Sequence, residues 1–102
     1  MAIIKNIHGE IMRRDDLPTV RDTLLAWVAE FRAKGKIPNL SSSDLRNSDL
    51  RGSDLSNSDL SSSDLRYSNL RGSDLSSSDL RNSDLRNSDL RNSDLRGSDL
   101  SS

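Results

Sequence analysis

The sequence predicts an all-β solenoid built from four-sided coils, preceded by a segment of different composition. The main observation is a leucine at every fifth position, thirteen times without a gap, from Leu40 to Leu100. A period of five fits neither an α-helix nor a straight strand, so the chain must turn at each repeat to keep the leucines inside. A fixed period of this kind indicates a repeat architecture rather than an ordinary globular core.

A self-comparison of the repeats indicates the length of one coil. Residues 41–60 and 61–80 are identical at 17 of 20 positions, whereas shifts of five, ten and fifteen residues give 14, 12 and 13 matches. Four five-residue sides per coil are therefore favoured. Residues 39–102 then form about three coils, close to the minimum for a stable repeat array.

The unit Ser-Asp-Leu-Arg-Asn resembles the pentapeptide repeat family, whose usual pattern is Ala-Asp/Asn-Leu-X-X. The resemblance implies a right-handed, four-sided β-helix with leucine at the inward centre of each side and the small residue two places earlier also inward. Serine here replaces the more common alanine. The uniformity of the repeats favours a consensus or engineered array, with a recently duplicated natural array as the alternative. The expected core ladder is Leu40, Leu45, Leu50, Leu55, Leu60, Leu65, Leu70, Leu75, Leu80, Leu85, Leu90, Leu95 and Leu100.

Residues 1–38 are expected to form a cap that begins with a short β-hairpin. Apolar residues lie on both sides of His8 and Gly9. This pattern predicts two short strands joined by a tight turn, in which Gly9 supplies the unusual backbone angles.

An amphipathic helix is expected over about residues 18–34. Asp15 or Asp16 is the expected N-cap, and Pro18 is tolerated in the first turn, where its missing N–H costs nothing. Gly35 is suited to the position that follows the helix.

One face of this helix is apolar and is expected to cover the first coil. Solenoids need such atypical ends because an open coil exposes unpaired backbone groups and invites aggregation. The alternative is that Trp27 and Phe31 form a partner-binding stripe. The residues of the face are Val20, Leu24, Trp27, Val28 and Phe31.

Composition excludes several classes of protein. The absence of cysteine rules out disulfides and thiolate metal sites. No apolar run has the roughly 20 residues of a membrane span, and the N-terminus lacks a signal peptide's apolar centre. We therefore expect a cytoplasmic protein that does not contact membranes.

The outer surface is expected to be charged but nearly balanced. From Asn39 onward, eight arginines and eleven aspartates give a net charge of −3. Some pentapeptide repeat proteins look like DNA and bind DNA gyrase or topoisomerase, but the arginines beside the aspartates weaken such mimicry here. The lack of a basic patch and of a stacking platform also opposes direct binding of nucleic acid.

No residues suggest an enzyme, a cofactor or a small-molecule substrate. Serine and aspartate recur because of the repeat, and His8 lies in the expected turn. We expect a non-enzymatic scaffold whose C-terminal coil is open. The expected consequence is a homodimer in which Leu95 and Leu100 lie at the interface.

Overall fold

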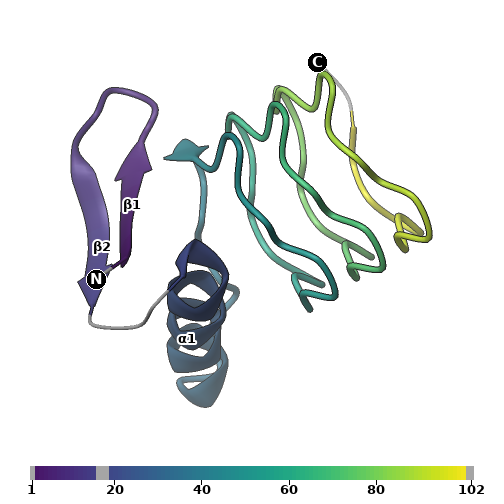
Figure 1. The fold of residues 1–102 in the computed structure, drawn as a ribbon. Coiled ribbons are helices and arrows are strands. Elements are labelled where there is room, and N and C mark those ends of the chain that lie inside the picture. The colour runs from purple at the N-terminus through teal and green to yellow at the C-terminus, as the bar shows by residue number, and fades with distance from the viewer. Residues whose placement is uncertain (1, 16–18, 101–102) are drawn as a thin grey trace.

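The computed structural model of the chain describes residues 2–15 and 19–100. Within it, residues 39–100 wind into stacked coils (Figure 1). Isolated parallel bridges join residues that are twenty apart, as between Asp49 and Asn69. At this bridge Leu50 N–H donates to the Asn69 carbonyl at 2.8 Å, and Asn69 N–H donates to the Ser48 carbonyl at 2.9 Å. The same pair of bonds recurs on each side and holds the coils together.

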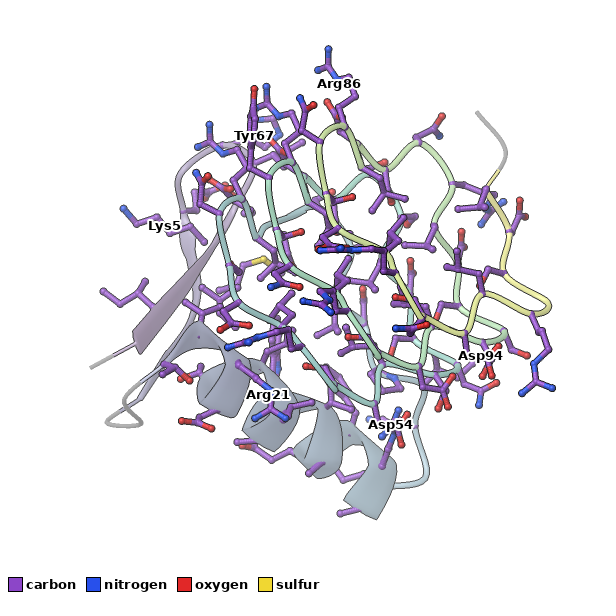
Figure 2. The ribbon with its side chains drawn as sticks, turned by 45° about the vertical axis from the view of Figure 1, so that its right-hand side comes forward. Lys5, Arg21, Asp54, Tyr67, Arg86 and Asp94 are labelled. Carbon is purple, nitrogen blue, oxygen red and sulfur yellow. The ribbon has the colours of Figure 1, made fainter. Side chains whose placement is uncertain are left out.

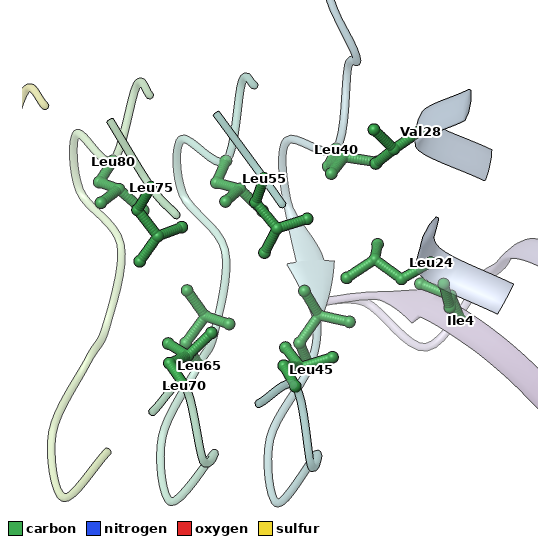
Figure 3. Packing of buried hydrophobic residues seen from close by; sticks show 12 residues of the cluster. Ile4, Leu24, Val28, Leu40, Leu45, Leu55, Leu65, Leu70, Leu75 and Leu80 are labelled. Atoms are coloured by element: carbon green, nitrogen blue, oxygen red, sulfur yellow. The ribbon is translucent and has the colours of Figure 1, made fainter. Parts of the chain in front are cut away.

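The leucines fill the centre of the solenoid (Figure 3). Every leucine from Leu40 to Leu80 has a relative exposure of 0–2 %. Leu85, Leu90 and Leu95 are partly buried against this cluster, and Leu100 is 54 % exposed. Each fully buried leucine contributes about 1.5–3 kcal/mol of transfer free energy. The core is therefore complete in the first two coils and opens toward the end of the chain.

A turn follows each leucine, and its backbone explains the last position of the repeat. The second residue after each leucine from Leu40 to Leu95 has φ between 56° and 70°. Asn or Gly occupies eight of these twelve positions, because both tolerate the left-handed region better than other residues do. Turns such as the one from Leu50 to Ser53 are closed by a 3.2 Å hydrogen bond from the serine N–H to the leucine carbonyl.

Strands β1 (Ala2–Asn6) and β2 (Ile11–Asp15) form an antiparallel hairpin. Its loop is held by the Asn6 side chain, which accepts hydrogen bonds from the N–H groups of His8 and Glu10. Gly9 has a φ of 85°, as a tight turn requires. Strand β1 also pairs with the short β3 (Ser43–Asp44), so the sheet order is β2-β1-β3 and the hairpin is joined to the first coil.

Helix α1 (Val20–Ala33) lies across the start of the solenoid (Figure 1). Thr19, rather than Asp15 or Asp16, is its N-cap, because Thr19 is extended and its hydroxyl accepts the Asp22 N–H at 3.1 Å. Asp15 belongs to β2, and Asp16 and Pro18 lie outside the described residues. Lys34 is the C-cap of the helix and is followed by Gly35 in the left-handed conformation. Gly35 N–H donates to the Arg32 carbonyl and Lys36 N–H to the Phe31 carbonyl, both at 3.0 Å, which is a Schellman motif.

Candidate functional site

The two ends of the solenoid are the candidate interaction surfaces. We call the backbone groups of residues 39–58 that face away from the second coil the first edge. We call the groups of residues 83–100 that face away from the preceding coil the last edge. Interior coils satisfy these groups through their neighbours, so both edges need other partners.

Residues of α1 and β1 cover much of the first edge. Strand β1 pairs with β3 on one side of the coil. Arg21 Nε donates to the Arg51 carbonyl at 2.7 Å, and Arg32 Nη2 donates to the Ser56 carbonyl at 2.8 Å. Arg32 also lies 3.5 Å from the Asp54 carboxylate.

The next coil shows what the two arginines replace. There, the carbonyl of Arg71 accepts the Gly52 N–H and the carbonyl of Ser76 accepts the Asn57 N–H, both at 2.9 Å. No earlier coil donates to the equivalent carbonyls of Arg51 and Ser56. The guanidinium groups of α1 therefore supply hydrogen bonds that backbone N–H groups supply elsewhere.

The five residues of the apolar face expected for the helix are buried to different extents. Leu24 and Val28 are 0 % and 1 % exposed and contact the leucine core, together with Ile4 of β1 (Figure 3). Val20 and Trp27 are partly buried against the core. Phe31 is half-buried and packs against Trp27, with ring centroids 5.8 Å apart.

The last edge is open within the described part of the chain. The backbone N–H groups of Leu85, Leu90 and Leu95 make no hydrogen bond there. In the preceding coils the equivalent N–H groups, such as that of Leu75, donate to an aspartate carbonyl at 2.8 Å. The last edge thus combines unpaired donors with partly exposed leucines, including the predicted interface residues Leu95 and Leu100.

The sides of the solenoid carry neutral ion pairs. In a typical repeat, Arg46 donates from Nε and Nη2 to the two carboxylate oxygens of Asp44 at 2.9 and 2.8 Å. Seven of the eight arginines after Asn39 pair in this way with the aspartate two residues earlier, among the described residues: Arg46, Arg51, Arg66, Arg81, Arg86, Arg91 and Arg96. The charged surface seen in Figure 2 therefore carries little net field.

The same aspartates also hold the turns. From Asn39 to Asp94, each Asp or Asn before a leucine accepts the backbone N–H two residues later, as Asp59 accepts from Ser61 at 3.0 Å. Side-chain hydrogen bonds from Arg86, Arg91 and Arg96 lower the pKa values of Asp84, Asp89 and Asp94 to about 2. These carboxylates remain ionised well into the acid range.

Tyr67 and Asn69 interrupt the regular surface. Asn69 accepts the Arg71 N–H at 3.2 Å, so it holds its turn as an aspartate would. It offers Arg71 no carboxylate, and Arg71 lies instead 4.0 Å from Asp89 of the next coil. Tyr67 is 61 % exposed and has a φ of 61°, a strained value for a bulky residue.

Nine of the twelve inward serines between Ser43 and Ser98 donate their hydroxyl groups to leucine carbonyls. Ser68 bonds to its own turn at Leu65, and Ser73 reaches back one coil to Leu50 at 2.8 Å. Only the Ser53 hydroxyl is buried without a partner among the described residues. Serine is therefore accommodated in place of alanine mainly by bonds along the solenoid.

Other kinds of site are not indicated by the described residues. They contain no group of three or more His, Asp or Glu side chains placed to hold a metal ion. They also contain no helix that is long and apolar enough to cross a membrane.

The sequence reasoning missed the roles of Arg21 and Arg32. Its helical pattern considered only apolar residues. The two arginines are eleven positions apart, which is about three helical turns and places them on one face. It also missed that the Asn and Gly residues found two positions after most leucines mark left-handed corners. The signal was present, since these residue types favour that conformation.

A solenoid whose coils are joined by parallel bridges is a β-helix. Residues 39–76 and 63–102 match the family described as pentapeptide repeats, in eight copies. The chain belongs to this family, whose repeats form a right-handed β-helix.

Two solved structures resemble the chain. A pentapeptide repeat protein from the cyanobacterium Cyanothece 51142 is 26 % identical and covers 63 % of the chain with a TM-score of 0.56. The chain spans 42 % of that protein's length. A pentapeptide repeat protein from Nostoc Pcc 7120 is 29 % identical over 85 % of this chain and 79 % of its own, with a TM-score of 0.32. No curated protein sequence gave a match.

Proposed function

We propose that the chain is a non-enzymatic structural scaffold that forms a homodimer by joining the last edges of two copies. Residues 1–38 act as a cap that keeps the first edge from associating. The observation that carries this proposal is the change in leucine exposure, from 0–2 % between Leu40 and Leu80 to 54 % at Leu100. The uniform repeats support a consensus or engineered origin for the scaffold.

The backbone of the last edge is complementary to itself. Around Asp94, the Leu95 N–H is a free donor and the Ser93 carbonyl is a free acceptor within the described residues. If two copies meet antiparallel at Asp94, each Leu95 can donate to the partner's Ser93 carbonyl. A patch that pairs with itself gives a closed twofold dimer rather than a fibre.

Sedimentation velocity over a series from low to high micromolar protein tests this proposal. We expect wild type to change from monomer to dimer and Leu100→Lys to remain monomeric. Ile37→Lys is the matched control, because Ile37 is 70 % exposed but precedes the first coil. A wild-type protein that stays monomeric at high micromolar concentration would refute the proposal, as would an equal effect of both substitutions.

The charges of the solenoid do not favour the alternative in which the chain mimics DNA and binds gyrase. A mimic needs an uncompensated negative surface, whereas the arginines here pair with aspartates in their own repeats. A supercoiling assay tests the alternative directly. We expect no inhibition of gyrase at high concentrations of the chain.

A further inference from the structure

We infer that the first edge contains a docking groove for an extended, acidic peptide segment of a partner protein, which would add to the solenoid as a strand. The groove lies over residues 46–50, between β1 and the first turn of α1. This site is independent of the proposed dimer contact, which lies on the last edge.

The backbone of this side has no neighbouring strand, unlike the adjoining side at β3, which pairs with β1. The N–H and C=O groups of Asp49 make no hydrogen bond within the described residues. The Arg46 carbonyl accepts only a long 3.4 Å contact from the Ser48 hydroxyl, whereas its equivalent at Arg66 accepts the Asn47 N–H at 3.0 Å. One donor and two acceptors are therefore available along a short stretch of extended chain.

There is also space for a strand at this place. A cavity of about 740 Å³ is lined by residues 46–49, 51 and 52 on one side and by Thr19 and the first turn of α1 on the other. A second hollow of about 360 Å³ continues it toward Ile3 and Lys5 of β1. Ser48 is half-exposed, although the three other inward serines of the first coil are buried. The side that contains Ser48 is therefore less covered than its neighbours.

An extended peptide matches the free backbone groups. Strand β1 already adds to the adjoining side of the same coil through Lys5 and Asp44. A strand over Asp49 would continue this arrangement and would supply the alternating donors and acceptors that a preceding coil would supply. At the usual rise per residue, about three to four residues of peptide would span the side.

The charges that face the groove favour an acidic peptide. Arg46 and Arg51 are paired with aspartates of their own repeats. The described charged side chains of the lining outside these pairs are Lys5, Arg21 and Asp22, which leaves one net positive charge. Lys5 has no ion-pair partner among the described residues, and the Arg21 guanidinium bonds to a neutral carbonyl. A carboxylate on the peptide would therefore find an uncompensated cation.

Titration of the full 102-residue chain with a synthetic peptide, acetyl-SSDLSSSDL-amide, followed by amide NMR shifts, tests this inference. We expect saturable shifts at the amide of Asp49 and its neighbours. The same peptide with N-methylated leucines should give none, because it lacks backbone donors for the Asp49 and Arg46 carbonyls.

Two charge variants complete the test. Lys5→Glu should weaken binding about two- to fivefold, the effect of one exposed ion pair. Lys36→Glu carries the same change beyond the far end of α1 and should bind as wild type does. The inference is overturned if millimolar peptide leaves the Asp49 amide unshifted. It is also overturned if the shifts occur at Leu95 on the last edge instead, or if the N-methylated peptide binds equally well.

Discussion

The first edge and the last edge have the same backbone chemistry but different surroundings. At the first edge, β1 pairs with one side, and Arg21 and Arg32 donate to carbonyls at two corners. At the last edge, leucine N–H groups of residues 85, 90 and 95 have no partner in the described part of the chain, and Leu100 is 54 % exposed. At the first edge, side-chain donors and the apolar face of α1 together take the place of a preceding coil.

Removal of the cap should have the largest effect on this comparison. Deletion of residues 1–36 would make both edges open, so the chain could associate end to end without closure. We expect filaments or precipitate, detected by light scattering and electron microscopy. A truncated chain that is soluble, folded and monomeric would show that the first edge needs no cover.

The arginine donors can be tested without removing the cap. Replacing Arg21 and Arg32 by methionine retains the apolar stems and removes the donors to Arg51 and Ser56. We expect the free energy of unfolding to fall by about 1 kcal/mol for each carbonyl left without its bond, reduced where water reaches the edge. Urea unfolding measures this.

Arg86→Met is the matched control for these arginine donors. Arg86 is exposed, pairs with Asp84 and does not cap a backbone group. An equal loss in the control would mean that Arg21 and Arg32 act only as surface charges.

The apolar interior can be predicted from the sequence, whereas the polar contacts that cover the first edge cannot. The spacing of Leu40 to Leu100 indicates the coil, because only an inward position requires one residue type at every repeat. The apolar face of the helix likewise indicates Leu24 and Val28, which are buried. Polar side chains that bond to distant backbone groups do not recur at a fixed period in the sequence. The hydrogen bond from Arg21 to the Arg51 carbonyl is therefore evident only from the three-dimensional structure.

The start of the helix and the corners of the coils are two further places where the sequence alone does not determine the local structure. Several residues near the helix start can serve as an N-cap, and the backbone angles at Thr19 decide among them. Tyr67 shows that the coil, and not the residue type, determines the backbone conformation at a corner. Its φ of 61° is imposed by the coil, although its residue type disfavours that value.

A change in the middle coil should alter stability without altering association at either edge. Tyr67→Gly should raise the free energy of unfolding by about 1 kcal/mol, because glycine tolerates the left-handed corner. Gly72→Ala places a strained residue at the next corner, where no atom lies within 4 Å of the added Cβ, and should lower stability by a similar amount. Thermal unfolding measures both. Destabilisation by Tyr67→Gly would show that the ring makes a contact that outweighs the strain.

Acid should lower the stability of the fold gradually, because it protonates the aspartates of the outer surface. The folded-state pKa values of Asp84, Asp89 and Asp94 are about 2, below the ordinary 3.8. Their contribution to stability is therefore fully present above pH 3.8 and is lost as the pH falls toward 2. The midpoint of thermal unfolding should decline over that window, and less so in high salt, where exposed pairs are already screened. A constant midpoint between pH 5 and pH 2 would show that these pairs do not stabilise the fold.

Amide hydrogen exchange at the two edges, measured at low and high protein concentration, tests the central claim most directly. The Leu95 N–H on the last edge and the Asp49 N–H on the first edge are both unpaired within the described residues. If the last edges of two copies associate, exchange at Leu95 slows as concentration rises, while exchange at Asp49 does not change. Exchange at Leu95 that is independent of concentration, or protection that appears at Asp49 instead, would contradict the account.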